Sequence, residues 1–254
     1  MNETSMQNKR AWEYRAYEFW NMRDGKPIEK ADKIKKNPKA CLKHHQKYFD
    51  DIEGLEIANP CGSNGRKAIP LALLGANVTI FDVSEENKQY AAELAYCAGV
   101  SIQYEICDFY DVDLSKYKSY FDIAYLEGGI LHYFHNIDLF CTILHCIIKP
   151  NGELILSDFH PFRKIISEGR VGENAKLTGG NYFDDGIYKG NVAYKKYFPE
   201  SEQQDFLDCS LRFYTLSEII NALIHAGFNI LEFNEHPNWD DKKIPGEITI
   251  YATK

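Results

Sequence analysis

The sequence predicts an α/β protein whose doubly wound, mostly parallel sheet, with an antiparallel C-terminal strand, lies between helices in three layers. Three observations support this fold class. Short apolar segments alternate with helical segments through the middle of the chain, which favours a parallel sheet. Two apolar segments at the C-terminal end follow one another with no helix between them. The chain has 254 residues and is 44% hydrophobic, enough to bury a large core in one domain.

The apolar runs expected as strands are residues 55–59, 77–82, 101–106, 121–127, 152–158, 228–233 and 247–252. The helical segments between the first five strands are expected at residues 66–74, 85–98 and 137–148. The crossover between the third and fourth strands is short and polar, so its helix is poorly marked.

The C-terminal part begins with the helix "TLSEIINALIHAGF", for which Thr215 is the expected N-cap and Gly227 the stop. The two strands that follow it are joined by a loop of about a dozen residues, which predicts an antiparallel pair at that edge of the sheet.

Two segments do not belong to the sheet. Residues 8–22 form an aromatic-rich helical stretch, and a second polar helix follows towards Phe49. Residues 161–213 carry many tyrosines and phenylalanines among glycines and charges, which suggests an inserted lid or, alternatively, an elaboration that stabilises an oligomer. We therefore expect one domain over residues 1–254. Its parts are a helical cap (1–50), a cofactor-binding core (51–160), the lid (161–213) and a C-terminal helix and hairpin (214–254).

Composition excludes several kinds of partner. The formal charge is −8, which argues against a nucleic-acid-binding surface. No apolar stretch approaches the ~20 residues of a membrane helix, and the first residues contain no apolar signal core. Seven cysteines without C-x-x-C spacing indicate free thiols. We expect a cytoplasmic protein that contacts neither membrane nor nucleic acid.

The stretch "IANPCGSNGRKAIPLALLGANVTIFDVSEEN", residues 57–87, predicts a ligand site after the first strand, since ligands of open α/β sheets bind at the carboxyl ends of strands. Gly62 and Gly65 allow close backbone approach, and Ser63 or Asn64 can cap the next helix. Asp82 ends the second strand, where a carboxylate can accept hydrogen bonds from ribose hydroxyls.

A nucleoside ligand is thus expected, and two features separate the dinucleotides from S-adenosylmethionine. The span "NPCGSNG" lacks the G-x-G-x-x-G pattern of dinucleotide sites, so a nicotinamide-dependent oxidoreductase is disfavoured. In "CDFYD", Asp108 can receive an adenine amino group while an apolar neighbour such as Phe109 covers the ring.

With these motifs, the chain resembles the class I S-adenosylmethionine-dependent methyltransferases. The glycine loop, Asp82, "CDF", "FDIAYLEGGILHYF" and "IIKPNGELILSDFHPF" stand in that family's order and spacing over residues 55–160. The runs "GSNGRKA", "SDFHP" and "YTLSEI" resemble an uncharacterised bacterial subgroup. The resemblance implies a Rossmann-like fold, S-adenosyl-L-methionine as cofactor and S-adenosyl-L-homocysteine as product.

The resemblance also implies which residues hold the cofactor. They are Asn59, Cys61, Gly62, Ser63, Asn64, Gly65, Asp82, Val83, Asp108, Phe109, Glu127 and Gly128, with the last pair beside the methionine portion. The family's loop reads acid-x-Gly-x-Gly-x-Gly. With the last glycine at Gly65, Asn59 stands at the acid, and Cys61 and Ser63 stand at the first two glycines. Pro70 should make the first turns of the next helix irregular.

Methyl transfer is an in-line displacement that depends on alignment and water exclusion, and a general base is useful for a hydroxyl or ammonium acceptor. His132 and His160 follow the fourth and fifth strands and are the candidates for substrate contact or proton removal, or are structural histidines. Tyr133 is a further candidate for substrate contact. His135 lacks a convergent carboxylate set, so no metal site is expected.

Aromatic side chains near the N-terminus can close the site. Tyr14, Tyr17 and Trp20 can cover a sulfonium by cation–π attraction and exclude water, or can simply pack on the sheet. Trp239 lies between the last two strands and either lines the entrance or caps the hairpin. The favoured function is methylation of a small-molecule acceptor. The alternatives are a methyltransferase acting on a macromolecule and a non-catalytic S-adenosylmethionine-binding protein; oligomeric state stays open.

Overall fold

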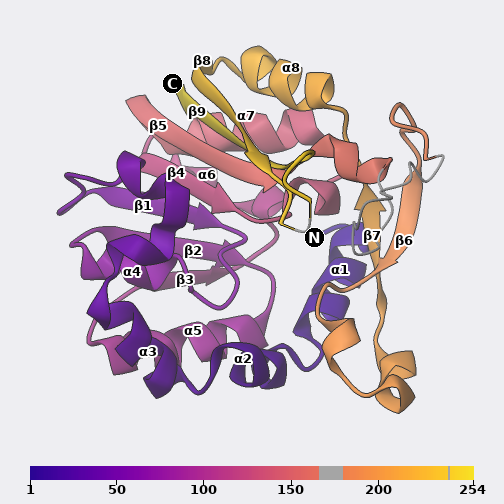
Figure 1. Cartoon of the computed structure of the whole chain (residues 1–254). Coiled ribbons are helices and arrows are strands. Elements are labelled where there is room, and N and C mark those ends of the chain that lie inside the picture. The colour runs from indigo at the N-terminus through magenta and orange to yellow at the C-terminus, as the bar shows by residue number, and fades with distance from the viewer. Residues whose placement is uncertain (166–179, 240) are drawn as a thin grey trace.

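The computed structural model describes residues 1–165, 180–239 and 241–254. Seven strands form one sheet in the order β3-β2-β1-β4-β5-β9-β8 (Figure 1). They are β1 (Glu56–Pro60), β2 (Asn77–Asp82), β3 (Gln103–Ile106), β4 (Phe121–Glu127), β5 (Ile148–Phe159), β8 (Asn229–Pro237) and β9 (Pro245–Thr253). Each predicted strand is present, and no end is shifted by more than four residues.

The first five strands pair in parallel, and β9 runs antiparallel to both of its neighbours, β5 and β8. The antiparallel C-terminal pair is therefore confirmed. The last strand of the chain enters the sheet between β5 and β8, so β8 forms the edge. The carboxyl ends of the parallel strands all lie at one end of the sheet, which is where a ligand site is expected.

Helices cover both faces of the sheet and complete the three layers (Figure 1). One face carries α6 (Leu114–Tyr117), α7 (Ile137–Ile147) and α8 (Leu216–Ala226). The other face carries α3 (Pro27–Lys36), α4 (Ala68–Leu73), α5 (Glu85–Ala98) and the 3₁₀ segment η1 (Lys39–Tyr48). Thr215 caps α8 and Gly227 ends it in a left-handed conformation, as predicted.

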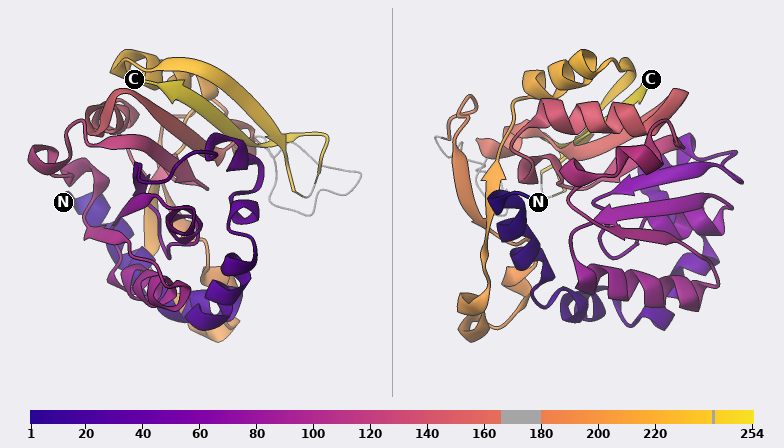
Figure 2. Two further views of the ribbon diagram at one scale, coloured as in Figure 1. Left: turned by 90° about the vertical axis from the view of Figure 1, so that its left-hand side faces the viewer. Right: turned by 180° about the vertical axis from the view of Figure 1, so that it is seen from behind.

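The aromatic N-terminal stretch forms two helices, α1 (Glu3–Glu13) and α2 (Ala16–Asp24). They are separated at Arg15, whose φ is +57°. Outside the main sheet, β6 (Ile187–Asn191) and β7 (Asp208–Arg212) form a two-stranded antiparallel ribbon. Figure 2 shows that α1 lies along this ribbon, at the carboxyl end of the main sheet. Residues 166–179 of the predicted lid are not among the described residues.

Short 3₁₀ turns connect these elements at the same end of the sheet. They are η2 (Phe109–Asp111), η3 (Leu131–Tyr133), η4 (Pro161–Lys164), η5 (Lys195–Tyr197) and η6 (Glu200–Asp205).

The helix expected at residues 66–74 is shorter than predicted, and its capping was predicted wrongly. The residue before α4 is Lys67, which makes no side-chain cap, so neither Ser63 nor Asn64 caps this helix. The amide of Asn64 instead bonds to Asp24 Oδ2 at 3.1 Å. Because α4 begins at Ala68, Pro70 falls in its first turn, where a missing N–H breaks no helical hydrogen bond.

Candidate functional site: a pocket at the carboxyl ends of the strands

A pocket of about 1350 Å³ lies at the carboxyl ends of the parallel strands. The loops after β1 to β5 form its floor, and side chains from α1, α2 and residues 187–213 form its opposite wall. Its volume exceeds the ~300–1,000 Å³ typical of a single-ligand site, so it has room for a cofactor and an acceptor together.

The glycine loop has the backbone conformation that the resemblance implies. Cys61, Ser63 and Gly65 have φ of +52°, +50° and +77°. These positions stand where the family has its three glycines, and only the last is a glycine here. A left-handed conformation costs an ordinary residue roughly 1–2 kcal/mol, so this loop keeps its shape at an energetic cost.

Asp82 fastens the glycine loop to the end of β2. Its Oδ2 accepts a hydrogen bond from the Ser63 backbone N–H at 3.1 Å. Its Oδ1 accepts bonds from the Ser84 N–H at 3.0 Å and from Asn87 Nδ2 at 3.2 Å. Burial raises the pKa of Asp82, while these donors oppose the rise. The carboxylate lines the pocket and holds the loop at the same time.

Three buried polar atoms in the described residues have no hydrogen-bond partner: Asn59 Oδ1, Ser63 Oγ and Asp108 Oδ2. All three residues line the pocket. Each residue is held by another bond, since Asn59 Nδ2 donates to the Tyr125 carbonyl at 2.8 Å and Asp108 Oδ1 accepts from the Tyr110 N–H at 3.0 Å. A buried polar group without a partner costs about 1–3 kcal/mol, which a ligand can remove by supplying the partner.

These atoms fit S-adenosylmethionine. The molecule carries an ammonium group, ribose hydroxyls and an adenine amino group, which are donors for the open oxygens. Gly62 also keeps the site open, because a Cβ atom there would lie 2.3 Å from Asn59 Oδ1. Val83 and Phe109 line the pocket beside Asp82 and Asp108 and offer apolar surface there.

Glu127 does not stand alone at the end of β4. Its carboxylate lies 2.9 Å from Arg66 Nη2 and 3.4 Å from Lys67 Nζ. Burial opposes its charged form, but Arg66 and Lys67 keep its pKa below the ordinary value. Gly128 follows with φ of +100° and lies against Arg66. Sequence analysis did not predict this pairing, which brings two cations to the border of the pocket.

His132 lies in η3 and faces the pocket. Its ring stacks with Phe159 at 6.2 Å and with Phe213 at 5.8 Å between centroids. In residues 1–165, 180–239 and 241–254 no hydrogen bond to either ring nitrogen occurs. Burial, followed by the charge of Arg163, lowers its pKa to about 4, so the imidazole is neutral near pH 7. A neutral imidazole with a free nitrogen is a proton acceptor.

His160 has a different environment, which argues against its expected role in proton removal. Its Nδ1 accepts a hydrogen bond from the Phe162 N–H at 3.1 Å, and its Nε2 lies 2.9 Å from Glu235 Oε1. Both ring nitrogens are thus engaged within the protein. The side chain caps η4 and ties it to β8, so it acts as a structural histidine.

Asp158 also has a structural role, because its carboxylate is bonded to backbone N–H groups. Its Oδ2 accepts hydrogen bonds from the backbone N–H groups of Ile130 and Leu131 at 2.8 and 2.7 Å. Burial raises its pKa, and these donors oppose the rise. Through them Asp158 holds the loop after β4, including the turn that carries His132.

The aromatic wall consists mostly of other rings than those predicted. Trp20 lines the pocket, and its Nε1 donates to Asn87 Oδ1 at 2.7 Å. Tyr14 is exposed and packs on Phe206, and the Tyr17 hydroxyl donates to Glu93. Neither tyrosine is among the residues that line the pocket. Trp12 and Phe19 line it instead.

Tyr133 lies in the pocket wall and joins the N-terminal helix to the ribbon. Its ring packs edge-on against Trp12 at 5.6 Å between centroids. Its carbonyl accepts a bond from Asn8 Nδ2 at 3.3 Å, and Asn8 also bonds both backbone groups of Ser210. Sequence reasoning missed Asn8, because a single asparagine in a polar helix carries no visible signal.

Two further residues singled out from the sequence lie at the periphery. His135 Nε2 is 3.4 Å from Ser210 Oγ. Trp239 lines the pocket mouth with 72% of its surface exposed, and Lys43 Nζ lies 5.8 Å from the centroid of its ring.

Comparison with known proteins agrees with this architecture. Residues 60–156 match the family described as Methyltransferase domain. A ubiquinone biosynthesis O-methyltransferase of Rickettsia canadensis is 29% identical over 160 residues, which cover 63% of each chain. The match therefore spans less than two thirds of that relative.

Solved structures share the fold. An S-adenosylmethionine-dependent methyltransferase of Mesorhizobium loti has a TM-score of 0.64 at 20% identity and covers 82% of this chain and 95% of its own. The magnesium protoporphyrin IX methyltransferase of Synechocystis, with bound SAH, has a TM-score of 0.60 at 14% identity and covers both chains fully.

Residues 60–156 therefore carry a methyltransferase domain, and the chain has the Rossmann-like fold of the class I S-adenosylmethionine-dependent methyltransferases. S-adenosylmethionine is its cofactor. Among the described residues, no helix is both long and apolar enough to cross a membrane. None of the seven cysteines forms a disulfide.

Proposed function

We propose that this protein transfers the methyl group of S-adenosylmethionine to a hydroxyl oxygen of a small-molecule acceptor. The observation that carries the proposal is a pocket with two kinds of unsatisfied group. Within the described residues, buried oxygens of Asn59, Ser63 and Asp108 lack partners at one end, and the neutral imidazole of His132, whose nitrogens make no hydrogen bond there, faces the other.

The cofactor end is assigned residue by residue. Asn59 Oδ1 receives the ammonium group, the Asp82 carboxylate receives the ribose hydroxyls, and Asp108 Oδ2 receives the adenine amino group. Phe109 covers the adenine face, and the backbone of Gly62 to Gly65 approaches the cofactor closely. Arg66 and Lys67, which already neutralise Glu127, supply positive potential for the cofactor carboxylate.

At the acceptor end, this chain's residues orient the acceptor and accept its proton. The rings of Phe159 and Phe213 each stack with the His132 ring and offer a flat apolar surface to the acceptor. His132 accepts the hydroxyl proton as the oxygen becomes nucleophilic, a role that typically contributes 10²–10⁴-fold. When bound, the cofactor supplies a methyl carbon already activated by a sulfonium. Alignment of the acceptor with the methyl carbon lowers the activation barrier further, by roughly 7–11 kcal/mol in well-oriented reactions.

An oxygen acceptor is favoured over nitrogen or sulfur by two arguments. A general base is useful for a hydroxyl or ammonium acceptor and unnecessary for a thiolate or a neutral amine, and His132 has the protonation state of a base. The curated relatives include several proteins named ubiquinone biosynthesis O-methyltransferase. The enclosed aromatic wall favours a small organic acceptor over a macromolecule.

The first test is calorimetric titration of the full chain with S-adenosylmethionine and S-adenosylhomocysteine, with NAD as the control. Micromolar binding of both sulfur nucleosides is expected, and binding of NAD alone would overturn the cofactor assignment. A methyl-labelled cofactor and a panel of phenols, amines and thiols then test the acceptor. Label in phenols that disappears in a His132→Ala variant supports the proposal; label only in protein or RNA, or none with any acceptor, contradicts it.

A further inference from the structure

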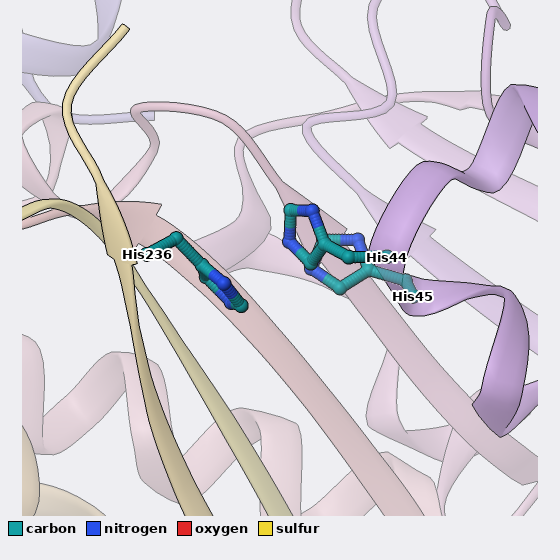
Figure 3. Close-up of side chains that lie close together, drawn as sticks. All are labelled: His44, His45 and His236. Atoms are coloured by element: carbon teal, nitrogen blue, oxygen red, sulfur yellow. The ribbon is translucent and has the colours of Figure 1, made fainter. Parts of the chain in front are cut away.

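A cluster of three histidines lies beside the pocket but takes no part in the proposed reaction. His44 and His45 stand on η1, and His236 stands on β8, almost 200 residues later in the chain. One ring nitrogen from each can be chosen so that all three lie within 4.8 Å of one another. Figure 3 shows the three rings facing one another in the space between η1 and the sheet.

We propose that His44, His45 and His236 bind a divalent transition-metal ion of the Zn²⁺ or Co²⁺ type, which links η1 to the edge strand of the sheet. Nitrogens bound tetrahedrally to Zn²⁺ at ~2.0–2.1 Å lie about 3.4 Å from one another. The widest separation in the cluster therefore has to shrink by at most roughly 1.4 Å, which side-chain rotation can achieve.

The existing hydrogen bonds allow this exchange without leaving the Thr249 hydroxyl unpaired. Nε2 of His45 and Nε2 of His236 both point at one atom, Thr249 Oγ1, at 3.0 and 2.9 Å. Two imidazole nitrogens thus already converge on a common partner. An ion can take the place of that partner, because the Thr249 hydroxyl keeps its bond to Ser157 Oγ at 3.2 Å.

The orientation of His45 in the bound state is also prepared. Its Nδ1 lies 2.9 Å from the Tyr125 hydroxyl, so that hydroxyl can accept the Nδ1–H once Nε2 binds the ion. Such an outer partner fixes the tautomer and the ring direction of a metal-binding histidine. His44 is exposed, and no hydrogen bond engages its ring nitrogens in the described part of the chain, so it offers the path by which an ion enters.

The ligand type agrees with such an ion. Three imidazoles without a carboxylate or thiolate suit Zn²⁺, Co²⁺, Ni²⁺ or Cu²⁺, whereas Mg²⁺ and Ca²⁺ prefer oxygen.

The test uses the full untagged chain after treatment with a chelator. Titration with Co²⁺, followed by visible absorption, and with Zn²⁺, followed by calorimetry, should show about one ion per chain, and Mg²⁺ should not bind. Loss of one ligand in His44→Ala or His236→Ala should weaken binding by at least about tenfold, the lower end of what loss of an outer partner alone costs.

The matched control is His225→Ala, since His225 is an exposed histidine on α8, which covers the opposite face of the sheet from η1. It should bind Co²⁺ as the unaltered protein does. Circular dichroism establishes that each variant is folded; His45→Ala is avoided because that ring is fully buried. The proposal fails if the unaltered protein binds no Co²⁺ or Zn²⁺ at about 100 μM, a concentration well above that of a built site. It also fails if binding is equal in the unaltered protein, His44→Ala and His236→Ala.

Discussion

The two ends of the pocket differ in whether their buried polar groups have hydrogen-bond partners. At the end formed by the loops after β1 and β3, buried oxygens of Asn59 and Asp108 have no partner in the described residues. At the end formed by the loops after β4 and β5, the buried groups of Asp158 and His160 are satisfied by backbone and side-chain bonds. His132 differs from its neighbours there, because no hydrogen bond reaches its ring nitrogens from any residue that the structure describes.

The difference separates binding from chemistry. At the cofactor end, buried acceptors without partners destabilise the unliganded protein until a nucleoside supplies hydrogen-bond donors. Satisfied groups at the acceptor end hold a rigid, mostly apolar surface on which one histidine is available for proton transfer. Variants at the first end should therefore change cofactor affinity, and a variant at His132 should change turnover.

The largest effect is expected for His132→Ala. Loss of the proton acceptor should lower kcat by about 10²–10⁴-fold, with cofactor Kd unchanged within about twofold. Labelled methyl transfer measures the first quantity and calorimetry the second. His135→Ala is the matched control, because His135 lies three residues further on and contacts Ser210. An equal loss of cofactor affinity and turnover in His132→Ala would remove the distinction between the two ends.

Asp82→Ala should have the next largest effect and act on the other end. It removes the expected ribose acceptor and releases the donors of Ser63, Ser84 and Asn87. Each charge-assisted bond contributes about 1.5–3 kcal/mol, so the Kd for S-adenosylmethionine should rise by tenfold or more. Asp113→Ala, an exposed cap of α6, is the control. Unchanged affinity in a folded Asp82→Ala protein would contradict the ribose assignment.

The pH dependence of the rate should identify the base. The pKa of His132 is lowered from 6.5 to about 4, first by burial and then by Arg163. Because a base must be unprotonated, the rate should stay level from pH 8 to about 5 and fall by about tenfold per pH unit below about 4. kcat/KM measured over pH 3 to 8 decides this. An acid limb centred near pH 6.5 would show that His132 is not the base, or is not buried.

The smallest effect concerns the backbone of the glycine loop. Ser63 has φ of +50°, and its Oγ has no protein partner, so Ser63→Gly removes strain without breaking a bond. The free energy of unfolding should rise by about 0.5–1 kcal/mol, since relief of roughly 1–2 kcal/mol is partly offset by a more flexible unfolded chain.

Urea denaturation measures this change, and Ser119→Gly provides the comparison because Ser119 has the same φ of +50° outside the pocket. Ser119→Gly should stabilise to a similar extent and leave cofactor affinity alone. Ser63→Gly should weaken cofactor binding severalfold, because Ser63 Oγ is one of the buried polar atoms without a partner in the described residues. If both variants bind the cofactor equally well, Ser63 Oγ has no part in the site.

Much of the fold and of the cofactor end could be predicted, because their signals are local. Alternation of strands and helices places the strand ends, and a parallel sheet brings those ends together, so Asp82 and Asp108 were placed in one pocket from their positions alone. The aromatic wall could not be predicted in detail. Trp12 and Phe19 line the pocket, whereas Tyr14 packs on Phe206 and Tyr17 bonds to Glu93, and these contacts join segments far apart in the chain.

By itself, the sequence determined the α/β class, the antiparallel C-terminal pair and the glycine loop, since each depends on residues close together in the chain. Only the tertiary structure decided whether His132 or His160 has ring nitrogens without hydrogen bonds in the described residues. His160 is engaged by Glu235, and His132 stacks with Phe213, a residue brought to it by packing. The approach of His236 to His44 and His45 has the same origin. Such contacts depend on sheet register and packing between distant segments, and short-range sequence patterns do not encode them.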